Sequence, residues 1–482
     1  QSGKPHQYSL ELLNEFIYPI RVYALDMFGT SGIRGQIGED VTAETALSVG
    51  RAVATWGGDG GDDSISIVLG RDARESGEVL ESAVSAGLRE CGADVLTAGC
   101  VSTPTVARAV HTQGADAGIM LTASHNPPPD NGIKLWNPDG QAFDTEQREA
   151  ITTIIKNNEY AFESWDNLGD VTECTGVEST HREALISAGT DLSGLSIAVD
   201  VGNGVGGITV DALYELGADV TTLHAREDGR FPGRPSEPTP DTCHRLRSHV
   251  AITNADLGIA HDGDADRMLA VDDRGEFVSG DKLLALFGRH AVNNSDSDSD
   301  SDGNQIAAPL NTSLAVDDAL AAAGASVSRT PVGDVYVAER VSADGVVFGG
   351  EPSGAWIWPE ETRCPDGPLA AVKLASLVHN HGSLASLTID EYRYALSRES
   401  IPIESTENEK TEIMTEVTRR VQETYTDVST MDGVRVEESD GWFLIRPSGT
   451  EALIRLTAQA ISPSRTDELL TDARQFVESG LK

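Results

Sequence analysis

Residues 64–70 and 93–99, Ser-Ile-Ser-Ile-Val-Leu-Gly and Ala-Asp-Val-Leu-Thr-Ala-Gly, are two short apolar runs that each end in glycine. This pattern is typical of buried β-strands. A helix is predicted between them, over residues 77–91, because its apolar residues recur at helical spacing. The predicted apolar face consists of Val79, Leu80, Ala83, Val84 and Leu88. A third buried strand is predicted at 117–123, and strand–helix–strand order predicts a parallel sheet covered by helices.

The same order returns twice, over residues 195–224 and 255–330. The tail differs, because a predicted helix at 408–425 is followed by three strand-like runs and a last helix at 465–479. We therefore expect an α/β protein with three similar mixed-sheet α/β/α domains and a C-terminal α+β domain around a central cleft. The expected limits are 1–26 for a leader or extension before a natural start at Met27, 27–160 for domain I, 161–254 for domain II, 255–380 for domain III and 385–482 for domain IV.

The composition is strongly acidic. Asp and Glu number 77 against 36 Lys and Arg, for a net charge of −41, and only seven of the basic residues are Lys. An acidic surface repels nucleic acid, and no apolar run reaches the length of a membrane span, so neither partner is expected. A scattered acidic surface poor in Lys resembles proteins of salt-loving microbes, in which molar salt screens the repulsion between like charges. A merely acidic protein of the cytosol is the alternative.

The five cysteines are odd in number and show no CxxC spacing. This argues against a disulfide framework or a zinc site and favours a reducing compartment. The first 26 residues also lack the pattern of a secretory signal. We expect a cytoplasmic protein, and the sequence does not indicate its oligomeric state.

The first motif that could carry chemistry is Thr-Ala-Ser-His-Asn-Pro at 122–127, directly after a predicted strand. A serine at the carboxyl end of a strand lies where open α/β sheets place their active sites. No Gly-x-Ser-x-Gly elbow surrounds Ser124, which argues against an esterase. A capped turn before the prolines of 127–129 is the structural alternative.

The second motif, Asp-Gly-Asp-Ala-Asp-Arg at 262–267, also ends a predicted strand. Three carboxylates at alternating positions can bind one hard cation if the loop curls around it. An EF-hand would need glycine at Arg267 and glutamate at Asp273, so that structure does not fit. Magnesium held by a few carboxylates and phosphate oxygens fits better, with a solvated acidic turn as the alternative.

The third motif, Arg-Pro-Ser-Gly-Thr-Glu at 446–451, combines a guanidinium, two hydroxyls and a glycine, which suits a phosphate cradle. Gly-Thr-Ser-Gly-Ile-Arg-Gly at 29–35 has the same ingredients. Gly-x-Gly-x-x-Gly at 202–207 follows a predicted strand, as in a dinucleotide-binding turn. The acidic pair Glu227 and Asp228 falls beyond the end of the next strand, which argues against that reading.

Together these motifs resemble the α-D-phosphohexomutase superfamily, which includes phosphoglucomutases, phosphomannomutases and phosphoglucosamine mutases. The resemblance runs from about residue 27 to the C-terminus, keeps the family's order and is strongest to the archaeal and bacterial glucosamine and mannose branches. The residues that carry it are FGTSGIRG (28–35), GRDAR (70–74), TASHNP (122–127), NGIK (131–134), DGDADR (262–267), VGD (332–334), GEPSG (350–354) and RPSGTE (446–451).

The resemblance implies a Mg²⁺-dependent intramolecular phosphotransferase whose partner is a small phosphosugar. It implies a phosphoserine at Ser124, a sugar bisphosphate as intermediate and activator, and a metal site formed by Asp262, Asp264 and Asp266 with an oxygen of the phosphoserine. The residues implied around the reacting phosphate are Arg34, Arg71, His125, Lys134 and Arg267, with Lys134 as a candidate acid/base. The implied substrate-binding residues are Glu351, Ser353, Arg446, Ser448, Gly449 and Thr450.

The resemblance leaves the sugar open among glucosamine, mannose and glucose phosphates. A phosphopentomutase acting on ribose 1-phosphate and 5-phosphate is the alternative, because Pro331 and Ala355 replace a Lys and a His that hexose-specific relatives carry. Trp356 and Trp358 are predicted either to stack on a sugar ring or to lie in the core. A Mg²⁺-dependent phosphatase, a nucleotide-binding oxidoreductase and a non-catalytic sugar-phosphate binder are the remaining alternatives.

Overall fold

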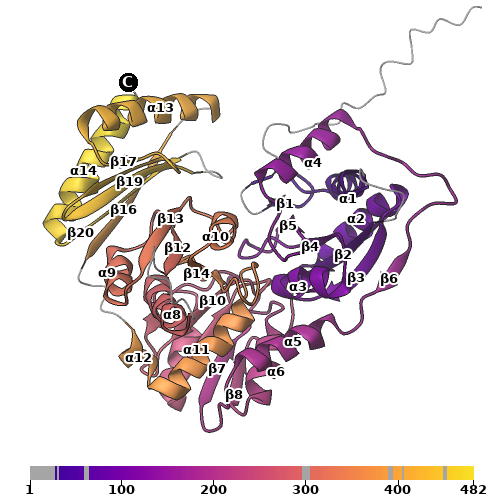
Figure 1. Ribbon diagram of the computed structural model, residues 1–482, viewed down its shortest axis with the longest axis horizontal. Coiled ribbons are helices and arrows are strands. Elements are labelled where there is room, and N and C mark those ends of the chain that lie inside the picture. The colour runs from indigo at the N-terminus through magenta and orange to yellow at the C-terminus, as the bar shows by residue number, and fades with distance from the viewer. Residues whose placement is uncertain are drawn as a thin grey trace, which may run out of the picture.

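The structure is a computed structural model, and it describes residues 28–29, 32–58, 65–295, 304–388, 394–403, 407–448 and 453–481. The expected leader at 1–26 lies outside the described residues. The chain forms four sheets that follow one another in an arc, with domain I at one end and domain IV at the other (Figure 1). This confirms the expected fold class of three mixed α/β/α sheets and a C-terminal α+β domain. Within the described ranges, no helix is both long enough and apolar enough to cross a bilayer.

Domain I is built on a six-stranded sheet in the order β1-β5-β4-β2-β3-β6. Strands β4, β2, β3 and β6 are mutually parallel, whereas β5 runs antiparallel to β4, and β1 runs antiparallel to β5 at the edge of the sheet. The bounds are β1 Ile33–Gln36, α1 Ala43–Gly57, β2 Ser66–Arg71, α2 Gly77–Glu90, β3 Asp94–Cys100, α3 Thr103–Gln113, β4 Ala117–Leu121, β5 Asp130–Trp136, α4 Thr145–Asn157 and β6 Val171–Glu173. Helices α1, α2 and α4 pack on one face of the sheet and α3 packs on the other, which explains why the central strands are continuous apolar runs.

Helix α2 packs closely against α1. A Cβ added to Gly87 would lie 2.2 Å from the carbonyl oxygen of Leu47, so only glycine permits this approach. Leu80, Val84 and Leu88 are buried against α1 and the sheet, as predicted. Val79 is 60% exposed, so its place on the predicted apolar face was wrong. The buried face of α2 is narrower than the predicted apolar face, because the backbone of Gly87 forms part of the contact with α1.

Domain II has a five-stranded sheet in the order β11-β10-β9-β7-β8. Its bounds are α5 Val177–Ala188, β7 Ser196–Asp200, α6 Gly207–Glu215, β8 Asp219–Leu223, α7 His244–Thr253, β9 Leu257–His261, β10 Met268–Val271 and β11 Phe277–Val278. The expected boundary at 254/255 falls inside this sheet, because β9 pairs in parallel with β7 and brings β10 and β11 with it. Similarly, β6 lies beyond the expected limit of 160 but pairs with β3 of domain I.

Domain III has a four-stranded sheet in the order β13-β12-β14-β15. Its bounds are α8 Gly280–Asn294, β12 Gln305–Pro309, α9 Leu314–Ala322, β13 Ser326–Thr330, α10 Asp334–Val341, β14 Val346–Gly350, β15 Trp356–Ile357, α11 Gly367–His381 and α12 Leu384–Leu387. Domains II and III share one large hydrophobic core. Trp356 and Trp358 are 0% and 3% exposed and pack on Phe287 with ring centroids 5.3 and 5.1 Å away. The core alternative is therefore the correct one, and neither indole forms a sugar-stacking wall.

Domain IV is an antiparallel sheet in the order β16-β20-β19-β18-β17, with its own core. Its bounds are β16 Ala395–Pro402, α13 Glu407–Thr424, β17 Val428–Ser429, β18 Val434–Glu438, β19 Gly441–Pro447, β20 Leu453–Ala460 and α14 Pro463–Gly480. The side chain of Gln459 joins it to the start of α9, accepting from the Leu314 amide at 2.8 Å and donating to Ser313 Oγ at 2.9 Å. Domain IV is thus seated on domain III.

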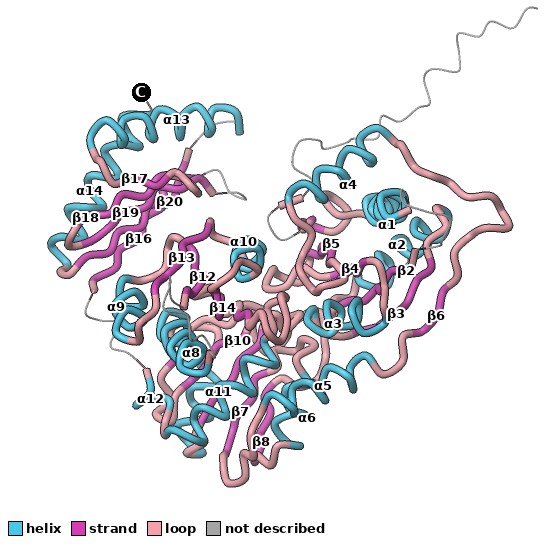
Figure 2. The backbone as a smooth tube through the Cα atoms, viewed as in Figure 1, coloured by secondary structure: helices cyan, strands magenta, loops and turns pink. Residues whose placement is uncertain are grey.

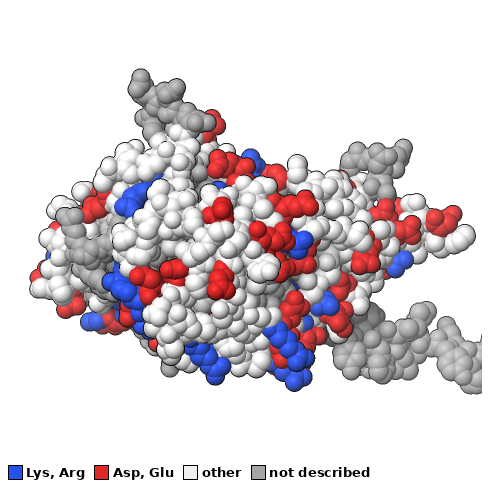
Figure 3. Space-filling view, turned by 90° about the horizontal axis from the view of Figure 1, so that it is seen from below, with Lys and Arg blue, Asp and Glu red and all other residues white. Residues whose placement is uncertain are grey.

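The surface carries the acidic excess. On the face seen in Figure 3, acidic side chains are scattered with basic ones between them rather than gathered into one patch. All five cysteines lie in the described part of the chain and are free thiols. In the interior of the arc, loops from domains I, II and III gather between α3 and α10 (Figure 2).

Candidate active site

Ser124 lies just beyond the end of β4 and is fully buried. Its φ of 51° is in the left-handed region, which costs about 1–3 kcal/mol for a residue other than glycine and persists only when the surroundings hold it. The Ser124 amide donates to Thr122 Oγ1 at 2.8 Å. The hydroxyl donates to Asp262 Oδ2 at 2.6 Å and lies 3.3 Å from Nδ1 of His125. The strained turn therefore aims the serine hydroxyl at the acidic loop of domain II.

That loop, residues 262–267, leaves the end of β9 and gathers three buried carboxylates. One oxygen each from Asp262, Asp264 and Asp266 lies within 4.8 Å of the others. Burial, and the neighbouring carboxylates after it, raise the pKa of Asp262 and of Asp266. Within the described residues, Oδ1 of Asp264 and Oδ1 of Asp266 have no hydrogen-bond partner. Buried carboxylate oxygens without partners fit a hard divalent cation such as Mg²⁺, which takes oxygen ligands.

Lys134 on β5 reaches the same loop. Its Nζ lies 2.8 Å from Asp264 Oδ2 and 2.5 Å from Asp266 Oδ2. Burial opposes the charge, but the two carboxylates outweigh it and raise the pKa of Lys134, so this side chain is an ammonium. Burial also opposes ionisation of Asp264, yet Lys134 and the hydroxyl of Thr103, 2.6 Å away, lower its pKa.

Two arginines complete the positive side of this site. The charge of Arg267, then burial, then the charge of Arg34 lower the pKa of His125 to about 2, so its imidazole is neutral. The Arg267 amide donates to Asp262 Oδ1 at 3.2 Å. Among the described residues, Nε of Arg34 is buried without a hydrogen-bond partner. A guanidinium with an unfilled donor, whose charge acts on His125 and Asp264, suits a phosphoryl group.

Arg71 is placed differently from the other predicted residues. Its guanidinium lies 3.1 Å from Glu81 and 3.3 Å from Glu78, both on α2. These ion pairs hold the side chain along α2, apart from the contacts that join Ser124, Lys134 and the aspartates.

Glu351 and Ser353 lie in the loop that follows β14. Glu351 is buried and accepts from the Gly333 amide at 2.8 Å and from Ser353 Oγ at 3.2 Å. Burial, and then the charge of Asp334, raise the pKa of Glu351 to about 7. The two loops of domain III are therefore joined at an acceptor that is half ionised near neutral pH.

The predicted phosphate loop of domain IV is described in part, with Gly449 and Thr450 outside the described residues. Arg446 Nε lies 2.8 Å from Asp432 Oδ2, and the same oxygen accepts from the Val332 amide of domain III at 3.0 Å. Ser448 is buried, and its carbonyl accepts from Lys410 Nζ at 2.8 Å. Arg446 therefore stands where domains III and IV meet.

Several residues of the site were not found from the sequence. Thr103 supports Asp264, and Ser236 Oγ donates to the Ser124 carbonyl at 2.9 Å. Arg74 lies within the GRDAR motif, but nothing in the local pattern distinguishes its guanidinium from that of Arg71. The glycine turn at 202–207 supports the acidic loop instead of a dinucleotide: a Cβ added to Gly204 would lie 2.4 Å from the oxygen of Gly263. A glycine in such a turn indicates that another group lies close to its backbone, and this group can be a protein loop as well as a cofactor.

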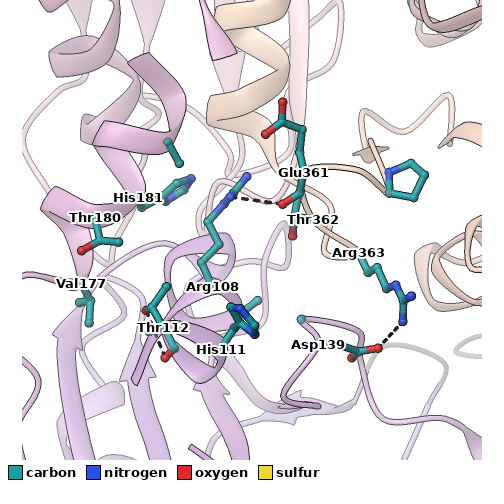
Figure 4. Close-up of a pocket in the computed structure, with 15 residues that line it drawn as sticks. Arg108, His111, Thr112, Asp139, Val177, Thr180, His181, Glu361, Thr362 and Arg363 are labelled. Atoms are coloured by element: carbon teal, nitrogen blue, oxygen red, sulfur yellow. Dashed lines mark hydrogen bonds and ion pairs between the residues drawn. The ribbon is translucent and has the colours of Figure 1, made fainter. Parts of the chain in front are cut away.

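A separate cavity of about 360 Å³ opens between α3, α5 and the segment 359–363 (Figure 4). None of the predicted site residues lines it. Two of its lining residues share a buried partner: Asp366 accepts from Arg108 Nε at 3.0 Å and lies 3.2 Å from His181 Nε2. Burial opposes the charge of Asp366, but His181 and Arg108 lower its pKa. This cluster joins the first three domains behind the acidic loop.

Comparison with known proteins identifies the family of the chain. The four domain families of phosphoglucomutase/phosphomannomutase match in order: alpha/beta/alpha domain I at 25–162, domain II at 180–275, domain III at 279–394 and the C-terminal domain at 403–475. The chain is 43% identical to a probable phosphoglucosamine mutase of Methanopyrus kandleri, over 92% of this chain and 95% of that protein. It is 42% identical to a probable phosphoglucosamine mutase of Methanosarcina acetivorans, over 95% of this chain and all of that one.

Solved structures show the same fold. A phosphoglucomutase/phosphomannomutase family protein from Burkholderia thailandensis matches with a TM-score of 0.81 and 25% identity, covering 94% of this chain and 97% of that one. An N-acetylglucosamine-phosphate mutase, at 15% identity and a TM-score of 0.56 over 93% and 96% of the two chains, shares the fold. The chain therefore belongs to the phosphoglucomutase/phosphomannomutase family of the α-D-phosphohexomutase superfamily, and it is a phosphosugar mutase.

Proposed function

We propose that this mutase interconverts glucosamine 1-phosphate and glucosamine 6-phosphate, with Mg²⁺, through a phosphoserine at Ser124 and a sugar bisphosphate. The observation that carries the proposal is the 2.6 Å contact from Ser124 Oγ to Asp262, inside a group of three buried carboxylates. The choice of glucosamine is supported by relatives above 40% identity, which are named probable phosphoglucosamine mutases.

Asp262, Asp264 and Asp266 would hold the magnesium ion, which when bound neutralises charge on phosphoryl oxygens and favours departure of the serine oxygen. Arg34, Arg267 and Lys134 would surround the remaining phosphoryl oxygens. Phosphoryl transfer depends mostly on positioning and on stabilising charge, and these residues supply both.

The chemistry has two halves. In the first, the bond from phosphorus to Ser124 Oγ breaks as a bond to a sugar hydroxyl oxygen forms, the hydroxyl proton passes to a base, and the departing serine oxygen takes a proton. In the second, the other phosphate of the bisphosphate returns to Ser124, whose proton is received by Asp262, while the departing sugar oxygen takes a proton. Lys134, an ammonium in this site, is the candidate that gives this proton.

The rest of the substrate would be held by domains III and IV. Glu351 and Ser353 would bind sugar hydroxyls, and Arg446, Ser448, Gly449 and Thr450 would hold the phosphate that does not react. The same cradle must accept either end of the bisphosphate, because the intermediate turns over between the two halves. The free cysteines are consistent with a reaction in the cytoplasm.

The test is ³¹P NMR of the purified protein in molar KCl with Mg²⁺ and trace glucose 1,6-bisphosphate. Glucosamine, mannose, glucose and ribose 1-phosphates are offered in turn. The proposal predicts movement of phosphate to the 6-position without free phosphate, fastest with glucosamine. Faster turnover of ribose 1-phosphate would show that the protein is a phosphopentomutase instead. Release of inorganic phosphate alone would show that it is a phosphatase.

Ser124→Ala tests the phosphoserine. We expect loss of mutase turnover and of phosphate incorporation from the bisphosphate, with the fold intact. Ser376→Ala is the matched control, because that hydroxyl donates to the Val372 carbonyl within α11 and accepts from the Thr190 amide at 3.3 Å, and neither contact involves Ser124 or the aspartates. Full activity of Ser124→Ala would refute the assignment.

A further inference from the structure

Arg74 is buried between the serine loop and domain II, and every N–H of its guanidinium is used. The side chain has no exposed surface. Its Nε donates to Asp72 Oδ2 at 3.0 Å. Its two Nη atoms donate at 2.7–2.9 Å to four carbonyl oxygens of one loop, those of Ser124, Asn126, Pro127 and Asp130. A planar guanidinium can make this set of contacts because its donors lie in a fixed fork.

These contacts close a ring around the backbone of Ser124. Asp72, which binds Arg74, also accepts from the hydroxyl of Thr122 at 2.7 Å. Thr122 in turn accepts the Ser124 amide, while Arg74 binds the Ser124 carbonyl. The amide N–H and the carbonyl oxygen of Ser124, whose φ lies in the left-handed region, are therefore both held by one connected hydrogen-bond network. Asp72 is fully buried, so the network is shielded from water.

The same side chain meets domain II. The ring of Phe231 lies 5.1 Å from the guanidinium carbon of Arg74. Ser236 Oγ donates to the Ser124 carbonyl from the opposite domain, so two donors hold that oxygen. A Cβ added to Gly263 would lie 2.8 Å from the same carbonyl oxygen, which shows how closely the acidic loop approaches.

We propose that Arg74 is a positioning residue that sets the distance between Ser124 Oγ and Asp262 by clamping the serine loop on the interface of domains I and II. This inference rests on the proposed function, because it assigns to Arg74 the placement of a phosphoryl-carrying serine. Arg74 does not touch the reacting atoms. Ser236 assists it through the second hydrogen bond to the Ser124 carbonyl.

Arg74→Lys keeps the charge but loses the fork, so it can satisfy only some of the five contacts. We expect kcat to fall about 100-fold, since a displacement of about 1 Å at a reacting atom can cost that much. The KM for the sugar phosphate should stay within about threefold, because substrate is bound elsewhere. Single-turnover incorporation of phosphate into Ser124 from glucose 1,6-bisphosphate should slow by the same factor as kcat.

Arg340→Lys is the matched control. Arg340 also uses its guanidinium for structural hydrogen bonds, to Ser328 Oγ and Gln305 Oε1 in domain III. It should lose stability without losing the rate of serine phosphorylation. Thermal unfolding of both variants in the same molar KCl separates a shift in geometry from a loss of folded protein.

Ser236→Ala keeps the inference testable if Arg74→Lys does not fold. It should lower kcat about fivefold at unchanged KM, by removing one hydrogen bond from the Ser124 carbonyl. The two variants should be non-additive when combined, because they act on one oxygen.

Wild-type kcat in folded Arg74→Lys, or in Ser236→Ala, would overturn the inference. A fall in kcat fully explained by the unfolded fraction would overturn it too. If the wild-type protein itself incorporates no phosphate, the proposed function fails and the inference falls with it. Failure of the proposed function can be told apart from failure of the inference, because it is seen in the wild-type protein before any variant is compared.

Discussion

Glu351→Gln should stabilise this protein at alkaline pH while weakening its activity. Glu351 is 6% exposed, and burial, followed by the charge of Asp334, raises its pKa from the ordinary 4.5 to about 7. Glutamine keeps the shape and can still accept from the Gly333 amide, which now donates to Glu351 Oε1 at 2.8 Å. The substitution therefore removes the charge and little else.

The size of the effect follows from proton linkage. Between the two pKa values the native state binds the proton more tightly than the unfolded chain, so stability falls as pH rises from about 4.5 to about 7 and is level above that. A carboxyl with these two pKa values destabilises the fold by about 1 kcal/mol at pH 5 and by about 3 kcal/mol at pH 8. Glutamine does not titrate, so Glu351→Gln should gain about 2 kcal/mol relative to the wild type between these pH values.

The assay is denaturant unfolding of both proteins at pH 5 and pH 8, without magnesium or substrate, at one molar KCl concentration. Glu339→Gln, an exposed glutamate on α10, is the matched control and should shift the two unfolding curves equally. A stability difference that is the same at both pH values would refute the reasoning about burial. Loss of stability at pH 8 would refute it more strongly, because it would mean that the ionised carboxylate holds the loops together.

Three further predictions concern the metal, the domain junction and the surface. Asp264→Asn should abolish the rise in unfolding temperature that Mg²⁺ gives the wild type and lower activity at least about 100-fold, because the site loses one of its three carboxylate ligands. Calorimetry with and without Mg²⁺ measures the change in unfolding temperature, and an unchanged Mg²⁺ effect would argue against the site. Asp366→Asn should cost about 3–5 kcal/mol of stability in urea unfolding, because buried His181 and the mostly buried Arg108 lose their shared anion, and a cost below about 1 kcal/mol would mean that the junction is not held by charge. Lowering KCl from molar to millimolar should lower the unfolding temperature, because a net charge of −41 is then unscreened, and a salt-independent transition would contradict the halophile interpretation.

The strands and helices were predicted well because their signals are local. The predicted helix at 77–91 and strand at 117–123 are α2 Gly77–Glu90 and β4 Ala117–Leu121. Domain limits were harder, because sheet membership depends on pairing between distant segments. Val199 pairs with Ile259 across 60 residues, and nothing in the sequence near Ile259 indicates that partner.

In the site, too, local features could be predicted and contacts between distant segments could not. That Ser124 and the acidic loop meet was implied by the family resemblance and not by the strand pattern, because the two strands that precede them, β4 and β9, lie in different sheets. The partners of Arg74 could not be predicted, because four of its acceptors are backbone carbonyls, which every residue type presents. The Trp356 and Trp358 indoles could be placed only once the core that domains II and III share was known.

The acidic surface and the basic site of this protein are compatible because they act over different distances. A sugar phosphate is an anion, and a net charge of −41 would repel it in dilute buffer. In molar salt the Debye length is about 3 Å, so an approaching phosphate responds only to groups it nearly touches. Those groups include buried cations beside the carboxylates: of only seven Lys, two are buried at the predicted phosphate-handling loops, Lys134 beside the aspartates and Lys410 under Ser448. The surface charge therefore determines how much salt the protein needs in order to stay folded, while the few buried cations determine which anions it can bind.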